Sequence, residues 1–232
     1  MSVAGLLNLN KPAGVTSFDC VRQVRRVLNV KRVGHCGTLD PLAQGVLVIL
    51  VGEATRYQRH FLEFEKQYWF RAQLGIETDS GDADGKTLSQ MPFDHLGLAD
   101  FQSAVATMIG NQWQIPPRVA AIHYAGRRLY EWARAGVDVP RPPRYITVYR
   151  FDTLTYTPPF WEARVVCSSG TYVRSLVHDV CKRLNTVGTV SALVRERVGR
   201  FQRSGAWAWS DVAPEKRTQL IEQGLQPCVD LF

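Results

Sequence analysis

The sequence contains no run of about 18 apolar residues, the length that a helix needs to cross a membrane. Its start, MSVAGLLNLNKPAG, carries neither the apolar core of a secretory signal peptide nor the Arg- and Ser-rich pattern of a transit peptide. We therefore expect a cytoplasmic protein with no membrane partner. With 45% hydrophobic and 21% charged residues, the chain also lacks the composition of a disordered protein, and its 232 residues fit one large domain.

Cysteine is sparse, and its spacing excludes two common uses. The five cysteines are an odd number, are widely spread, and never form a Cys-x-x-Cys pair of the kind that zinc sites use. We therefore expect neither a disulfide framework nor a structural zinc site. Reduced, mostly buried thiols are the simplest prediction, because a free cysteine packs as a small apolar side chain.

Lysine is scarce as well, since arginine supplies 22 of the 28 basic residues behind the net charge of +7. Guanidinium groups bind phosphate with two hydrogen bonds and stack on bases, so an arginine-rich surface favours a nucleic-acid partner. Residues 1–60 and 116–150 each carry a net charge of +5, and residues 61–115 carry −5. The positive blocks could line a groove for a phosphate backbone, although a solvated charged face explains the same pattern.

Hydrophobic periodicity predicts several helices and strands in one sheet-centred α+β body. Helices are expected at 17–28 (with Ser17 as a possible N-cap and Phe18 on the apolar face), 98–109, near 127–136 and at 171–184. Strands are expected at 46–51, 66–74, 119–124, 145–156 and 160–168, with strand and turn over 189–203. The polar stretch 75–91 is predicted to be a loop.

The segment 34–41, GHCGTLDP, is the densest cluster of special residues in the chain. It places one histidine and one carboxylate, Asp40, among glycine and proline residues between a basic helix and a buried strand. Loops held by rigid elements often carry reactive groups. A tight turn in which Asp40 makes only a local hydrogen bond explains the residue types equally well.

Ordered pieces of the sequence resemble the TruB-type tRNA pseudouridine synthases. The matching pieces are KPAGVTS from Lys11, GHCGTLDPLAQGVL from Gly34, GEATR from Gly52, KQY from Lys66, LGIETDSGDADGK from Leu74, Pro116-Pro117, RRLYEWAR from Arg127, SGTYVRSL from Ser169, and Leu193-Val194-Arg195 with Val198-Gly199. The resemblance implies an isomerase that converts a uridine of the tRNA T-loop, position 55, to pseudouridine. It also implies that no cofactor and no metal take part.

The resemblance gives three residues a catalytic role. Asp40 aligns with the catalytic aspartate, which attacks the nucleotide at C1′ or at C6, and both options stay open. Arg174 aligns with the arginine that pairs with that aspartate and keeps it charged. Tyr68 aligns with the active-site tyrosine, which stacks on the uracil and assists removal of the C5 proton; by residue type alone, Tyr68 on an apolar strand face would belong to the core.

Further residues are predicted to bind the substrate. A uridine inside a stacked loop must flip out to reach a carboxylate, and His35 aligns with the residue that takes the vacated position. Tyr172 and Leu193 align with residues that line the uracil pocket. Gly37 and Thr38 belong to the same motif loop as Asp40, and Lys11 is a weaker candidate for a phosphate contact, together with Arg22, Arg25 and Arg26.

The resemblance also implies an architecture, the pseudouridine synthase fold. We expect an α+β domain over residues 1–232 with a central mixed, mainly antiparallel sheet flanked by helices and loops, and a possible small insertion around 75–115. The sequence departs from the family pattern at Cys36, where threonine is usual, and at Ala120-Ala121, where Ser-Ala is common. It stops where many members continue into a small C-terminal RNA-binding domain of the PUA type, so a catalytic domain alone is expected.

The residues leave two other function classes open. A glycosidase also cleaves at C1′ but normally needs a second carboxylate, which the acidic loop could supply. A non-catalytic RNA-binding module fits the charge pattern as well. Calcium binding at 82–85 is rejected, because the twelfth position of such a loop would be Met91 instead of glutamate. The expected partner is the T-arm of tRNA, bound by a monomer with no obligate protein partner.

Overall fold

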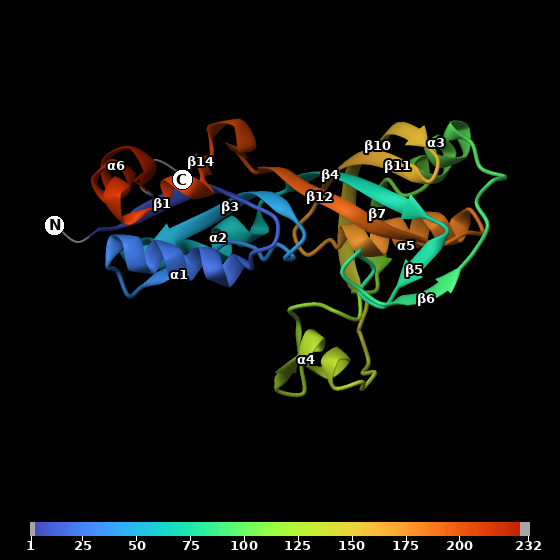
Figure 1. Ribbon diagram of the computed structural model, residues 1–232, viewed down its shortest axis with the longest axis horizontal. Coiled ribbons are helices and arrows are strands. Elements are labelled where there is room, and N and C mark those ends of the chain that lie inside the picture. Colours follow the sequence, from blue (N-terminus) through green and yellow to red (C-terminus); the bar gives the residue numbers. More distant parts are fainter. Residues whose placement is uncertain (1–2, 228–232) are drawn as a thin grey trace. The chain divides into compact units, whose positions relative to one another are not determined.

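The computed structural model describes residues 3–227 and divides into two compact units (Figure 1). The first unit comprises Met1–Gln67 and Val194–Phe232, and the second comprises Tyr68–Leu193. Strands β4 (Lys66–Leu74) and β12 (Gly188–Val198) each contain one of the boundaries. Both units combine helices with strands.

Short helices and strands make up the first unit, together with the boundary parts of β4 and β12. Its helices are α1 (Ser17–Leu28), α2 (Gln58–Glu63) and α6 (Arg217–Gln219). Its strands are β1 (Gly5–Lys11), β2 (Val33–His35), β3 (Gln44–Val51), β13 (Phe201–Gln202) and β14 (Trp207–Ala208). Short segments of 3-10 helix occur at Gly52–Tyr57, Arg203–Gly205, Trp209–Asp211 and Pro214–Lys216, and a π-helical turn at Leu220–Gly224.

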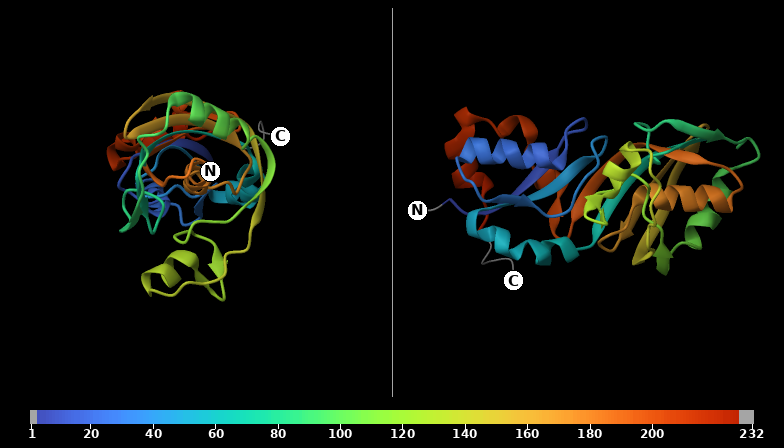
Figure 2. Two further views of the ribbon diagram at one scale, coloured as in Figure 1. Left: turned by 90° about the vertical axis from the view of Figure 1, so that its right-hand side faces the viewer. Right: turned by 90° about the horizontal axis from the view of Figure 1, so that it is seen from below.

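The sheet of the first unit has the strand order β14-β1-β3-β12, with β2 paired to β3 and β13 to β12. The pairs β1–β14 and β3–β12 are parallel, and β1–β3, β2–β3 and β12–β13 are antiparallel. Alternate residues of β1 and β3 face opposite sides, so each face has its own core. Leu7 and Ile49 pack against α1 on one face, and Leu6 and Leu50 pack with Phe61 of α2 on the other (Figure 2).

The N-cap of helix α1 is one residue earlier in the chain than the predicted Ser17. Thr16 is the N-cap, and its Oγ1 accepts from the Asp19 N–H at 3.0 Å while the Asp19 carboxylate accepts from the Thr16 N–H at 2.8 Å. Ser17 therefore lies in the first turn. The buried stripe of α1 is centred on Val24 and Leu28, and the predicted core residue Phe18 lies beyond its edge, 55% exposed.

The second unit contains the longer strands and the helix that carries the GTYVR motif. Its helices are α3 (Leu98–Ala106), α4 (Leu129–Arg134) and α5 (Val173–Arg183). Its strands, besides those shared at the boundaries, are β5 (Ile76–Thr78), β6 (Thr87–Gln90), β7 (Gly110–Gln114), β8 (His123–Tyr124), β9 (Arg127–Arg128), β10 (Arg144–Thr157) and β11 (Phe160–Cys167).

The second unit has a sheet with the strand order β12-β4-β11-β10-β7, and aromatic side chains form the core on one face of it. Trp161 of β11 is fully buried, stacks on Phe101 of α3 at a centroid distance of 4.9 Å, and meets Phe70 of β4 edge to face at 5.1 Å. The pairs β7–β10 and β10–β11 are antiparallel. The mixed, mainly antiparallel pairing with flanking helices confirms the predicted α+β class.

The periodicity predictions hold where one face of an element is buried. Helices α1 and α5 and strands β3, β4, β10 and β11 lie within two residues of the predicted ranges. Helix α3 ends at Ala106, three residues early. The predicted loop 75–91 contains the β5–β6 hairpin, and of the predicted strand 119–124 only His123–Tyr124 is extended. The segments where the prediction was wrong are polar or proline-rich. The alternation of apolar and polar side chains therefore says little about their secondary structure.

Two predictions about composition can be compared with the structure. Cys20, Cys36, Cys167 and Cys181 are buried thiols outside any disulfide, as expected, and Cys228 lies outside the described residues. Within residues 3–227, no helix is long and apolar enough to cross a membrane.

Gly45 gives the first testable prediction. It has φ +110°, and an added Cβ would lie 2.2 Å from the backbone oxygen of Arg195 on β12. Gly45→Ala should therefore lower the free energy of unfolding by at least about 2 kcal/mol, through backbone strain and displacement of β12. Urea denaturation measures this cost. Gly205→Ala, where an added Cβ meets nothing within 4 Å, is the control and should change stability by less than about 0.5 kcal/mol; equal costs would contradict the prediction.

Candidate active site

Asp40 lies in the first unit, on the loop that joins β2 to β3. The residue is half-buried, and its backbone oxygen accepts from the Ala43 N–H at 3.1 Å, which tightens the loop after it. At the start of the loop, the Cys36 N–H donates to Val48 O of β3 at 2.8 Å. Backbone hydrogen bonds thus fix both ends of the loop.

Ser17 of α1 holds the residue that precedes Asp40. The Leu39 N–H donates to Ser17 Oγ at 2.8 Å, and Ser17 Oγ donates to Leu39 O at 3.1 Å. On the other side of Asp40, the Gly14 N–H donates to Pro41 O at 2.8 Å. The Asp40 backbone is therefore held from two directions by the segment that leads into α1.

Arg195 of β12 supports the loop through hydrogen bonds, a role that was not predicted from the sequence. Its side chain is 1% exposed, and its guanidinium donates to Val46 O at 2.7 Å, Gly37 O at 3.0 Å and Thr38 O at 3.4 Å. A buried guanidinium needs acceptors, and here the carbonyls of the motif loop supply them. The only sequence signal was its place in the Leu193-Val194-Arg195 match.

Lys11 is a second buried cation beside the same loop. It is 0% exposed, and its Nζ donates to Val15 O at 2.7 Å, Pro12 O at 2.8 Å and Pro41 O at 3.3 Å. Burial lowers the pKa of Lys11 from 10.5 to about 8, Arg195 adds to the lowering, and the carboxylate of Asp40 opposes it. An ammonium enclosed by three carbonyls is placed to order the loop, which does not support the predicted phosphate contact.

The remaining predicted residues of the first unit lie on the same loop. His35 ends β2, is half-buried, and its backbone oxygen accepts from Gln58 Nε2 at 2.8 Å. Gly37 and Thr38 come shortly after His35, and the backbone oxygens of both accept hydrogen bonds from the Arg195 guanidinium. Their role in holding the loop is therefore visible, and their contact with substrate stays a prediction.

Arg174, in the second unit, is held by Ser80 and Asp82 of the acidic loop, which is also the segment rejected above as a calcium site. Its guanidinium donates to Ser80 O at 2.5 Å and to Val119 O at 2.9 Å, and its Nε lies 3.6 Å from Asp82 Oδ2. Both side chains of this ion pair are more than nine-tenths buried. Asp82 also accepts from Ser80 Oγ at 2.5 Å. The pairing of Arg174 with Asp40 stays a prediction.

Tyr172 precedes α5 and is positioned by Gln114, a buried residue of β7 that sequence reasoning missed. The Tyr172 N–H donates to Gln114 Oε1 at 2.8 Å, and Gln114 Nε2 donates to Tyr172 O at 3.1 Å. Tyr68 on β4 is 9% exposed and Leu193 on β12 is 5% exposed. The second unit thus contains Tyr68, Tyr172, Arg174 and Leu193, and the first unit contains Asp40, His35 and Lys11.

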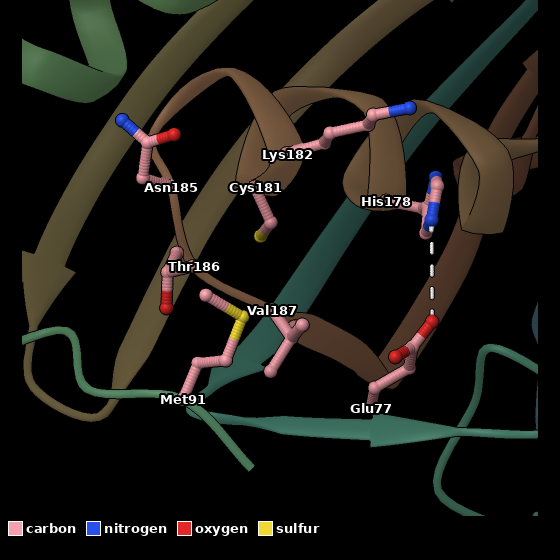
Figure 3. A pocket seen from close by; sticks show the side chains of 9 residues that line it. Glu77, Met91, His178, Cys181, Lys182, Asn185, Thr186 and Val187 are labelled. Atoms are coloured by element: carbon pink, nitrogen blue, oxygen red, sulfur yellow. Dashed lines mark ion pairs between the residues drawn. The ribbon is translucent and has the colours of Figure 1, made fainter. Parts of the chain in front are cut away.

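A pocket of about 270 Å³ opens in the second unit beside the C-terminal half of α5 (Figure 3). His178 Nε2 lies 4.0 Å from Glu77 Oε1 at one side of the pocket, and Cys181 of α5 also lines it. A hydrogen bond with Asp179 raises the pKa of His178, and burial raises that of the Cys181 thiol to about 12. None of the predicted site residues lines this pocket. Within residues 3–227, no group of three or more His, Cys, Asp or Glu side chains could hold a metal ion.

Comparison with protein families decides which chemistry this arrangement serves. Residues 25–173 match the model of the TruB family pseudouridylate synthases, N-terminal domain. The chain belongs to the TruB family. It is therefore a pseudouridine synthase, an isomerase that acts on uridine in RNA.

Curated relatives of this pseudouridine synthase cover most of its length. A protein of Endomicrobium trichonymphae named tRNA pseudouridine synthase B is 41% identical over 90% of this chain and 91% of its own length. One of Caldanaerobacter subterraneus subsp. tengcongensis with the same name is 40% identical over 100% of this chain and 82% of its own. The alignment with the second relative spans the whole chain and therefore includes the loop of Asp40 and the motif of Arg174.

Solved structures agree on the fold of this TruB family member. The crystal structure of a Cbf5-Nop10-Gar1 complex contains a chain that superposes with a TM-score of 0.70 at 26% identity. The match covers 96% of the present chain and 57% of that chain, so our protein spans a little over half of its length. The predicted pseudouridine synthase fold is confirmed.

The ion pair in the second unit leads to a stability prediction. Asp82→Asn removes the charge that faces the buried Arg174 guanidinium, and breaking a buried pair in this way should cost about 3 kcal/mol of unfolding free energy. Asp84→Asn changes an exposed carboxylate of the same loop and should cost less than about 0.5 kcal/mol. Urea denaturation of both variants checks this. If the two substitutions prove equally mild, Asp82 is not the partner that stabilises Arg174.

Lys11 leads to a prediction about pH. Its pKa is about 8 in the folded protein and near 10.5 in the unfolded chain, so between these values the unfolded state binds more protons. The unfolding free energy of wild type should therefore rise with pH from 8 to 10.5, by up to roughly 3 kcal/mol, relative to Lys11→Met. Urea denaturation of both proteins at pH 7, 8, 9 and 10 measures the difference. Parallel pH profiles would contradict the lowered pKa.

Proposed function

We propose that this protein converts the T-loop uridine of tRNA, position 55, to pseudouridine, with Asp40 as the nucleophile. Family membership supports uridine isomerisation, and the names of the curated relatives support tRNA as the substrate. The observation that carries the assignment of Asp40 is the way its loop is held. Ser17, Lys11 and Arg195 all bind backbone atoms within three residues of Asp40, in the unit that contains it.

The reaction rearranges one nucleotide and needs no external reactant. The bond from N1 to C1′ breaks, the uracil turns over, and a bond from C5 to C1′ forms, while C5 loses a proton and N1 gains one. Asp40 attacks the nucleotide at C1′ or at C6 and leaves again when the new bond has formed. A loop with a fixed backbone helps this attack, because a nucleophile gains most when it is held close to its target.

The second unit is proposed to act on the same uridine. Arg174 pairs with the reacting carboxylate, Tyr68 stacks on the uracil and assists removal of the C5 proton, and Tyr172 and Leu193 line its binding site. The buried Asp82 supports this role for Arg174, because it fixes a guanidinium that otherwise has several rotamers. His35 is proposed to take the place of the flipped base.

We also propose that residues 1–232 act as one catalytic domain in the cytoplasm, as a monomer. The strands β4 and β12 support a single domain, because each contributes residues to both compact units. The segment 75–115, expected as an insertion, forms β5, β6, α3 and β7 of the second unit.

Substitution of Asp40 tests the proposed function. Asp40→Asn keeps the side-chain shape and removes the negative charge, so it should abolish pseudouridine formation in an unmodified tRNA transcript while the Kd for tRNA stays within a few-fold of wild type. Asp84→Asn, an exposed acid of the second unit, should keep wild-type turnover.

Three outcomes distinguish the function classes. Pseudouridine formed by wild type and by Asp84→Asn, but not by Asp40→Asn, supports the proposal. Release of free uracil by wild type would indicate a glycosidase, and tRNA binding without either product would indicate a binding module. Turnover by highly purified Asp40→Asn would overturn the role of Asp40.

A further inference from the structure

The outer face of strands β7 and β10 carries large aromatic side chains that are exposed to solvent. Trp113 is 68% exposed and Tyr145 is 60% exposed, and they are direct neighbours across the two strands. Their rings meet edge to face at a centroid distance of 5.2 Å. The opposite face of β10 is buried at Ile146 and Val148, so the exposed aromatics belong to one side of a well-packed ladder.

Further residues extend this surface along both strands. Tyr149, two steps beyond Thr147 on β10, is 52% exposed, and Ile115, just after β7, is 56% exposed. Between the aromatics, Thr147 Oγ1 donates to Asn111 Oδ1 at 2.7 Å. We call the surface formed by Trp113, Ile115, Tyr145 and Tyr149 the aromatic platform. Exposed aromatic side chains gathered on one pair of strands mark a binding surface more often than scattered single side chains do.

The platform adjoins the most basic part of the second unit. Strand β7 ends at Gln114 and β10 begins at Arg144, and the connection between them, 115–143, projects from these two ends with α4 at its tip (Figures 1 and 2). Residues 115–144 contain six arginines and two carboxylates, a net charge of +4. Arg127 lies over the Trp132 ring at 5.1 Å, and Arg134 over Tyr130 at 5.4 Å.

We propose that the aromatic platform binds RNA outside the modified nucleotide, with bases stacking on Trp113 and Tyr145. The proposal rests on the proposed function in one respect, that the substrate is RNA. Exposed aromatic rings beside a positively charged segment are the combination that single-stranded and looped RNA uses, because every base offers a π-face and every phosphate a negative charge. A positively charged neighbourhood fits this partner better than a second copy of a chain with net charge +7.

The platform predicts a particular pattern of binding changes. Removing the two rings should weaken tRNA binding by about tenfold or more, since stacking on aromatic side chains contributes substantially for each base. The salt dependence of binding should stay as in wild type, because no phosphate contact is lost. The value of kcat at saturating tRNA should also stay unchanged, and KM should rise.

The experiment compares Trp113→Ala/Tyr145→Ala with a matched pair of exposed apolar side chains in the same unit, Leu88→Ala/Leu98→Ala, which are 61% and 42% exposed in wild type. Fluorescence anisotropy with labelled unmodified tRNA gives Kd at two salt concentrations, and sedimentation gives the mass of each protein. We expect a weakened Kd for the platform variant only, wild-type Kd for the control, and near-complete rescue by Trp113→Phe/Tyr145→Phe.

A platform variant whose Kd lies within twofold of wild type overturns the proposal. So does a wild-type dimer that the platform substitutions convert to monomer without changing RNA affinity, because the surface is then a protein interface. The test is separable from that of the proposed function. If wild type binds tRNA but forms no pseudouridine, the catalytic assignment fails, and the loss of affinity in the platform variant still decides the role of the platform.

Discussion

A guanidinium removed from water must find hydrogen-bond acceptors, and Arg195 finds them in the backbone of the Asp40 loop. Three carbonyls of this loop and of the start of β3 surround it. The approach is possible because Gly45, its neighbour across the ladder, has no side chain. On the other side of Gly45, Lys11 of β1 is the paired residue. Two buried cations therefore bracket the start of β3, and the loop before it has little freedom.

The second unit uses the same principle with a different acceptor. Arg174 is also buried, but it faces a carboxylate, Asp82, as well as two carbonyls. Asp82 lies in the acidic stretch 79–84, which resembles a calcium loop in sequence, and it neutralises this buried cation. One carboxylate of the acidic block 61–115 is therefore paired inside the protein.

The arginine excess serves two separate purposes in the structure. Arg174 and Arg195 are interior residues that position backbone, whereas the arginines of 115–144 belong to the projecting connection beside the aromatic platform. Net charge alone does not separate these uses. Arg195 lies in the first unit and supports the Asp40 loop, Arg174 lies in the second unit beside Asp82, and the exposed guanidinium groups of the arginine-rich connection are chemically suited to phosphate.

The sequence by itself determined the elements with one buried face, because alternation and helical spacing record local geometry: α1, α5, β4 and β10 were predictable in this way. The motif letters also named Asp40, Tyr68 and Arg174. Only the tertiary structure decided the partners. Arg195 and Gly37 lie 158 residues apart, and their contact follows from the register of β12 on β3, as the burial of Asp82 follows from the packing of its loop on α5. Such long-range pairing leaves no periodic trace in a single chain, because it depends on which surfaces fold together.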